Sequence, residues 1–183
     1  MAVTTDTRAG ARANVLGVAA AAMLAATGAV AHAAPAPAAM LPAQGALVAG
    51  KSLGGLRIGM TPAQVLHAWG RKYGVCRSCR DRTWYFTYRP YQPQGAAVSF
   101  RGGRVDAIWT LWSPPGWRTR NGTLELGARE SEATAVLGPL FTAPCGSYNA
   151  LLRTRGALTT VYYMFAGKLW GFGLMNASAS ACR

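Results

Sequence analysis

Two short stretches of the chain carry apolar residues at helical spacing. In the first, Thr61 suits the N-cap position, Pro62 suits the first helical position, and Gln64 completes a capping box. The pattern predicts a helix that runs to about Trp69 and ends at Gly70, because glycine readily adopts the backbone conformation that terminates a helix.

The second stretch places Ala133, Val136 and Leu137 on one helical face before a Gly-Pro pair ends the pattern. Arg129 occupies the position that corresponds to the capping threonine of the first stretch. We therefore expect Ser131 to cap the second helix, which begins less cleanly than the first.

Strand-like sequence follows each helix, after a loop that contains cysteine. Runs of β-branched and aromatic residues predict strands at 83–89 and 96–112 in the first half and at 157–175 in the second. Within these runs, residues 100–105 and 164–169 each read as strand, glycine turn and strand, which is typical of a hairpin.

The two halves of the chain resemble each other. Residues 56–70 align without gaps with residues 124–138, which lie 68 positions later. The hairpins are offset by 64 positions, so a short deletion separates the halves. We expect an α+β fold of two degenerate repeats, each a short helical segment packed on antiparallel strands.

The beginning of the chain has the pattern of a signal peptide, which we place at residues 1–33. Arg8 and Arg12 precede an apolar run at 15–30, and the small residues around Ala33 suit a signal peptidase. The run is shorter than the roughly 20 residues a membrane-spanning helix needs. We expect a secreted protein, in the medium or the cell envelope, without a transmembrane segment after cleavage.

Residues 34–50 are rich in alanine and proline and predict a disordered linker. Residues 51–183 then suffice for one globular domain, made of repeat 1 (51–117) and repeat 2 (118–183). All four cysteines lie in this domain, and export favours disulfides. Three pairings are possible, and we favour Cys76 with Cys79 and Cys145 with Cys182, because the second ties the last residues to the body.

A short motif resembles a known superfamily. Residues 59–66, ending at Gly70 and followed by 98–100 and 103–105, resemble the superfamily of the beta-lactamase inhibitory proteins and the SmpA/OmlA outer-membrane assembly lipoproteins. The motif recurs in weakened form around Gly127, as in the tandem-repeat inhibitors. This resemblance implies helices packed on an antiparallel sheet over most of 53–183, and a protein-binding surface.

Catalytic chemistry is poorly represented. His67 is the single histidine after the expected cleavage point, and carboxylates are few, so no triad, metal cluster or phosphate loop is visible. We expect no enzyme activity, no cofactor and no metal. Cys76 and Cys79 have the spacing of a redox motif, but a helix precedes them and a strand follows, so a thiol-disulfide oxidoreductase is a distant third hypothesis.

Charge instead indicates a binding surface. The chain has 19 basic and 6 acidic residues, a formal net charge of +13, which favours acidic partners. Arginine and aromatic residues, the types enriched at binding hot spots, cluster after the first helix and at the junction of the halves. The predicted binding residues are Arg71, Lys72, Arg77, Arg80, Arg82, Trp84, Tyr85, Arg89, Trp112 and Trp117.

Alternation along the first predicted strand places Trp84 and Tyr85 on opposite faces, so half of its aromatics should be core. Trp117 lies in a Pro/Gly loop beside arginine, and we expect it to be exposed, whereas Trp109 lies within a strand and is expected to pack. The predicted function is a secreted, non-catalytic protein-binding module, inhibitor-like in mode. The alternative is a module that holds anionic wall or membrane polymers by charge. Export disfavours a nucleic-acid role.

Overall fold

The computed structural model describes residues 45–87, 95–112 and 116–183, which lie in one compact unit. The predicted signal peptide at 1–33 and the first part of the predicted linker, 34–44, lie outside the described residues. The described part is mostly β-sheet with two short helices, which agrees with the expected α+β class.

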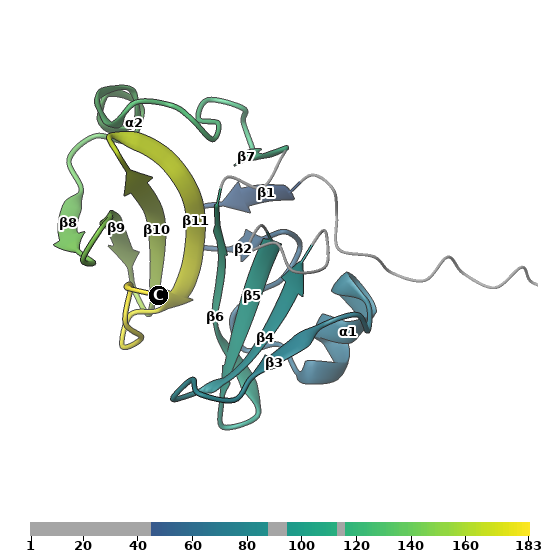
Figure 1. Ribbon diagram of the computed structural model, residues 1–183. Coiled ribbons are helices and arrows are strands. Elements are labelled where there is room, and N and C mark those ends of the chain that lie inside the picture. The colour runs from purple at the N-terminus through teal and green to yellow at the C-terminus, as the bar shows by residue number, and fades with distance from the viewer. Residues whose placement is uncertain (1–44, 88–94, 113–115) are drawn as a thin grey trace, which may run out of the picture. The chain divides into compact units, whose positions relative to one another are not determined.

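An eight-stranded antiparallel sheet makes up most of the fold (Figure 1). At its centre β6 pairs with β11, and three strands extend outward on each side. From one edge to the other the strands are β3 (Gly74–Cys76), β4 (Arg82–Thr87), β5 (Gly95–Arg101), β6 (Arg104–Leu111), β11 (Lys168–Asn176), β10 (Leu158–Phe165), β9 (Asn149–Arg155) and β8 (Phe141–Pro144).

Helix α1 (Pro62–Trp69) has the ends that the sequence predicts. The Thr61 hydroxyl accepts a hydrogen bond from the Gln64 backbone N–H at 3.3 Å, and the Gln64 side chain accepts one from the Thr61 N–H at 2.8 Å. Gly70 ends the helix with a φ of 85°, a conformation that glycine adopts without strain. The predicted capping box and terminator are confirmed.

Helix α2 (Glu130–Leu137) begins earlier than expected, because its N-cap is Arg129 rather than Ser131. The Glu132 carboxylate accepts a hydrogen bond from the Arg129 N–H at 2.8 Å. An arginine side chain has no acceptor atom, so only this half of a capping box forms. Glu132, three positions after Arg129, is the sequence feature that indicates this helix start.

Each half of the large sheet consists of a helix followed by four strands, and the segment before each helix joins the last hairpin in the same way. Val105 on β6 accepts from the Gly59 N–H and donates to the Met60 carbonyl, both at 2.8 Å. In the second half Leu169 makes the corresponding two bonds at 2.7 Å, with Gly127 and Ala128.

The two predicted hairpins form with matching geometry. Arg101 pairs with Arg104 across the first turn and Phe165 pairs with Lys168 across the second, and a register shift precedes each turn. Three strands of the large sheet were not predicted from the sequence, namely β3, β8 and β9. Two of them are short edge strands of three and four residues, which carry too little sequence for an alternating pattern to be recognised.

A smaller sheet corrects the predicted linker. Its strands are β2 (Ser52–Leu53), β1 (Gly45–Val48) and β7 (Trp117–Thr119), in that order. Residues 45–50 are thus ordered, contrary to the prediction of a disordered linker to residue 50. Leu47 is 1% exposed and belongs to the main core, and burying such a side chain stabilises a fold by roughly 2 kcal/mol.

The two faces of the large sheet are packed differently. One face, with both helices and the small sheet, contains a core centred on Trp69, Trp84, Phe86, Ile108 and Phe172. The Trp69 indole donates to the Gly54 carbonyl at 2.7 Å, so its polar atom is satisfied inside this core. The opposite face has a second cluster to which neither described helix contributes, and it carries the candidate site.

We predict that Gly171→Ala destabilises the protein by about 3 kcal/mol, because a Cβ on Gly171 would collide with the Thr110 backbone carbonyl of β6. Gly74→Ala is the matched control, since a Cβ there meets no atom within 4 Å. Urea denaturation of both variants measures the two free energies of unfolding. Equal midpoints would show that β6 and β11 are not packed as closely as described.

Candidate functional site

The candidate site lies on the face of the large sheet opposite the helices. One row of laterally paired residues crosses the β4, β5, β6 and β11 strands as Tyr85, Ala97, Trp109 and Gly173. Paired residues project from the same face, so Tyr85 and Trp109 stand apart with the small Ala97 between them. This spacing leaves a hollow above β5.

A second row lies two residues along the same strands, with Thr83, Ser99, Ala107 and Met175 paired in turn. It is also built on small side chains in its middle. Ser99 is 1% exposed and forms part of the floor of the hollow. The short side chains in the middle of the two rows form the floor of the hollow, and larger side chains such as Tyr85 and Trp109 border it.

The last seven residues, 177–183, run over this face, and we call them the strap. Ala179 and Ala181 pack against the second cluster. The Tyr163 hydroxyl donates to the Ala181 carbonyl at 3.0 Å, and the Arg183 N–H donates to the Tyr148 hydroxyl at 2.6 Å. Hydrogen bonds with Tyr163 of β10 and with Tyr148, which lies between β8 and β9, therefore hold the strap at two points.

Disulfides join Cys145 to Cys182 and Cys76 to Cys79, so the favoured pairing is confirmed. The first links the strap to the residue after β8, with the two Cα atoms 5.2 Å apart. The second closes the loop between β3 and β4, beside the same hollow, with a Cα separation of 5.5 Å.

A cavity of about 870 Å³ lies between the strap and strands β4, β5 and β6. Its walls come from the β3–β4 loop, from the aromatic residues of the sheet and from the strap. The lining residues are Cys79, Arg80, Asp81, Thr83, Tyr85, Phe86, Gly95, Ala96, Ala97, Ser99, Arg101, Trp109, Leu111, Trp112, Ser178, Ala179, Ser180, Cys182 and Arg183.

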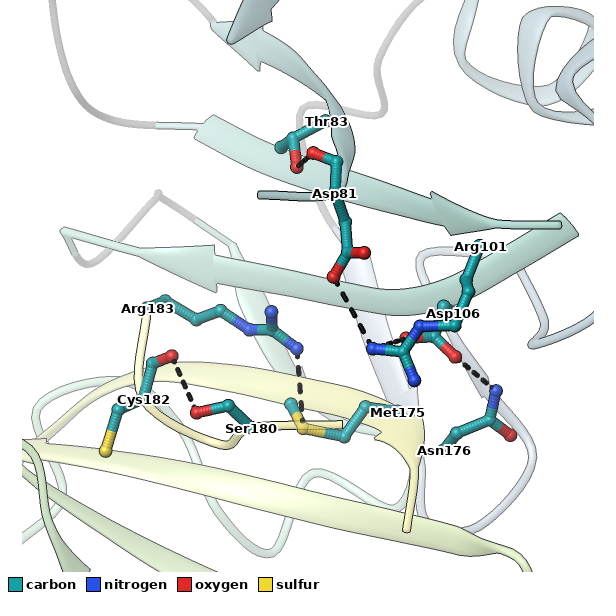
Figure 2. A network of polar contacts seen from close by, with 9 residues as sticks. All are labelled: Asp81, Thr83, Arg101, Asp106, Met175, Asn176, Ser180, Cys182 and Arg183. Atoms are coloured by element: carbon teal, nitrogen blue, oxygen red, sulfur yellow. Dashed lines mark hydrogen bonds and ion pairs between the residues drawn. The ribbon is translucent and has the colours of Figure 1, made fainter. Parts of the chain in front are cut away.

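The acidic residues at one end of the cavity are already paired. Arg101 lies 3.5 Å from an Asp81 carboxylate oxygen and 3.4 Å from an Asp106 carboxylate oxygen (Figure 2). The Asn176 amide donates to the other oxygen of Asp106 at 2.6 Å. The Asp106 side chain is only 5% exposed, and these partners satisfy its buried charge.

Arg183 extends from the strap toward the same network (Figure 2). Its guanidinium carbon lies 4.4 Å from the centre of the Trp109 ring, a cation–π contact, and one of its terminal nitrogens lies 3.6 Å from the Met175 sulfur. Burial raises the pKa of Tyr163 above its ordinary value, although the charge of Arg183 acts in the opposite direction. Tyr163 is therefore neutral and does not neutralise Arg183.

Exposed aromatic side chains stand at the mouth of the cavity. Trp112 is 52% exposed and has a φ of 67°, a left-handed conformation that is uncommon for a bulky residue. Its ring lies 5.5 Å from that of Trp170, which in turn contacts Tyr148 and Phe165. Trp112 thus begins a run of aromatic rings across this face.

Three of the predicted binding residues meet at this cavity, namely Arg80, Tyr85 and Trp112. They come from the β3–β4 loop, from β4 and from the end of β6. As expected from alternation, Tyr85 is exposed while Trp84 is buried. The cavity is therefore lined by arginine and aromatic residues, as predicted for the binding surface, but most of these residues are not the predicted ones.

Two predicted anchors are core residues. Trp84 is 2% exposed and stacks on Tyr73, and Trp117 is 1% exposed, with its ring edge-on to Trp69 at 6.3 Å. The expectation that Trp117 is exposed is wrong, because it belongs to β7 and pairs with Gly45 of β1. This partner strand comes from the segment that was predicted to be a disordered linker. Without it, nothing in the sequence indicates that Trp117 is buried.

The remaining predicted residues do not line the cavity. Arg82 projects from the other face of β4, where its guanidinium lies 5.0 Å from the Trp84 ring. Three further predicted residues are exposed near α1 and in the β3–β4 loop, namely Arg71, Lys72 and Arg77. Arg89 lies outside the described residues.

Ser99, Arg101 and Arg183 line the cavity but were not predicted as site residues. The signal for Arg183 was present, since the favoured pairing of Cys182 already placed the last residues against the body of the domain. Ser99 and Arg101 carried no such signal. Their place depends on which face of β5 the helices cover.

Other chemistry finds little support in the described ranges. They contain no group of three or more histidine, cysteine, aspartate or glutamate residues that could hold a metal ion. Cys76 is the last residue of β3 and Cys79 lies in the β3–β4 loop, so neither is at a helix N-terminus, where redox thiols are stabilised. In the described part of the chain, no helix has the length and apolarity needed to cross a membrane.

No protein-family model and no curated protein matches the chain. Two solved structures are similar in part. An extracellular protein containing an SCP domain from Bacillus anthracis is 12% identical, with a TM-score of 0.48, and the match covers 66% of this chain and 44% of that protein. A DUF4309 family protein from Bacillus subtilis is 19% identical, with a TM-score of 0.48, and the match covers 68% of this chain and 84% of that one.

We predict that replacing Cys145 and Cys182 by alanine destabilises the protein more than replacing Cys76 and Cys79. Loop-closure entropy gives about 4 kcal/mol for a sequence separation of 37 and about 2 kcal/mol for a separation of 3. Urea denaturation of the two double variants checks the order, and hydrogen exchange at 177–183 reports release of the strap. Equal losses would contradict the prediction.

Proposed function

We propose that this protein is a secreted, non-catalytic binding module that engages a partner protein through the cavity-bearing face of its large sheet. The observation that carries the proposal is the cavity of about 870 Å³, open on a face with no described helix and bordered by Arg80, Tyr85 and Trp112. Arginine and large aromatic residues are the side chains most enriched at protein-binding hot spots.

The character of this face favours a protein over an anionic polymer. Trp112 and Phe165 expose about half of their surface, and they contact the same Trp170 ring. Exposed aromatic surface of this kind is stabilised by an apolar partner, whereas a charged polymer needs only a field of positive charge. Arg101, moreover, is engaged with two aspartates and has less charge to offer.

Secretion is supported by the two disulfides, which form and persist in oxidising compartments, together with the signal-peptide pattern at 1–33. A non-catalytic role is supported by the chemistry of the cavity. Its described titratable side chains are arginines, one aspartate and one tyrosine, which do not form a nucleophile with an adjacent base.

We also propose that the two halves are degenerate repeats, as in the tandem-repeat inhibitors that the sequence resembles. In support, Val105 and Leu169 make corresponding pairs of hydrogen bonds to the segments before α1 and α2. The glycines after both helices, Gly70 and Gly138, have φ values of 85° and 73°. An inhibitor-like mode, in which the sheet face receives part of the partner, fits this architecture.

The proposal predicts that purified mature protein captures a partner protein from culture medium or envelope fractions and retains it in high salt. Trp112→Ala and Tyr85→Ala should each weaken capture about tenfold or more, because they remove anchors at the cavity. Val136→Ala, which truncates an exposed apolar residue on α2, is the matched control and should have no effect.

Mass spectrometry of the retained material and titration of the partner measure these outcomes. Capture of wall or membrane polymer alone, lost in high salt and unaffected by both aromatic substitutions, would contradict the proposal. That result would establish the alternative, an envelope module that binds anionic polymers by charge.

A further inference from the structure

Two buried hydrogen-bond donors of the cavity have no acceptor. The Ser99 hydroxyl and the Nε–H of Arg183 are both shielded from solvent, and neither has a hydrogen-bond partner in the described part of the chain. Leaving such a group unpaired destabilises the fold. Both residues line the same cavity, so one ligand inside it would lie beside both side chains.

The sheet register places these donors near each other. Ser99 pairs with Ala107 on β6, and Ala107 pairs with Met175 on β11. The Ser99 and Met175 backbones are therefore about 10 Å apart, two strand spacings. The Arg183 guanidinium contacts the Met175 sulfur, so it lies above the strand beyond Ala107. Ala107, which lies between them in the register, has only a methyl side chain.

The charge of Arg183 is also unbalanced. Within the described ranges Arg183 forms no ion pair, whereas Arg101 has two. Its neighbours are the Trp109 ring, the Met175 sulfur and the hydroxyl of Tyr163, which is neutral and hydrogen-bonds to the guanidinium group without balancing its charge. A partly buried guanidinium without a counter-ion attracts an anion, because the cavity gives it less solvation than bulk water does.

We propose that the cavity receives the carboxylate of an aspartate or glutamate side chain from a loop of the partner protein, bound by the Nε–H of Arg183 and the hydroxyl of Ser99. This inference rests on the proposed function, since it specifies what the partner inserts. Tyr85 and Trp112 then contact the residues on either side of the acidic side chain.

A single carboxylate suits the cavity better than a phosphate group. Asp81 lines the same cavity, and although Arg101 pairs with it, the oxygen–nitrogen distance is 3.5 Å and the carboxylate keeps part of its field. The two unpaired donors, the Nε–H of Arg183 and the hydroxyl of Ser99, match the two oxygens of a carboxylate, whereas a phosphate group has further oxygens for which these two groups offer no donor. Arg80, at the β3–β4 loop, adds positive charge that draws a singly charged group inward.

The test uses nuclear magnetic resonance of the mature protein labelled with ¹⁵N, titrated with millimolar capped glutamate (N-acetyl, N-methylamide). Capped glutamine is the probe control, because it has the same shape without the charge. We expect saturable shifts of the Arg183 Nε–H signal and of the Ser99 amide with capped glutamate, and none with capped glutamine.

Ser99→Ala should weaken binding of capped glutamate about fivefold, and it should not destabilise the fold, because the lost hydroxyl has no partner. Arg183→Gln should weaken binding about tenfold or more. Arg155→Gln, at the exposed last residue of β9, is the matched charge control and should leave binding unchanged. Circular dichroism verifies that each variant is folded.

Equal shifts with the two probes, or shifts confined to exposed arginines such as Arg71 and Arg77, would overturn the inference. Partner capture separates its failure from that of the proposed function. If Trp112→Ala abolishes capture while Arg183→Gln and Ser99→Ala do not affect it, the protein is a binding module that does not bind a carboxylate in this cavity.

Discussion

The fold depends on the antiparallel pairing of β6 with β11, which joins two four-stranded halves into one sheet. This contact requires close approach of the two backbones, since Gly171 lies directly against the Thr110 carbonyl and the Phe172 N–H donates to the Thr110 hydroxyl at 3.1 Å. Because α1 and α2 lie on the same side of the sheet, joining the halves edge to edge leaves one continuous face that neither described helix covers.

The uncovered face is stabilised by other means. The strap packs alanines on it, two tyrosine hydroxyls bond to the strap backbone, and the Cys145–Cys182 disulfide limits how far the strap can separate. This cover is incomplete, since it spans the β9–β11 side and leaves the side of β4 and β5 as an open cavity. The binding surface we propose is thus the part of the sheet that neither helix nor strap protects.

The site shows where sequence reasoning stops. Alternation correctly separated Trp84 from Tyr85, because period-two geometry is a property of any strand. It could not assign a function to Ser99 or Arg101, since a strand pattern identifies two faces but not which of them a helix will cover. Trp117 was misassigned for a related reason. Its burial requires β1, a strand from a segment whose alanine- and proline-rich composition resembles a disordered linker.

The sequence by itself determined the features that depend on neighbouring residues: the two helices and most of their ends, the two glycine hairpins, and the α+β class. It also indicated both disulfides, because spacing and export leave few alternatives. Only the tertiary structure decided that β6 and β11 meet, that Arg183 lies on Trp109, and that Ser99 faces a cavity. These contacts join residues far apart in the chain, and their free energy comes from packing and desolvation that no local pattern encodes.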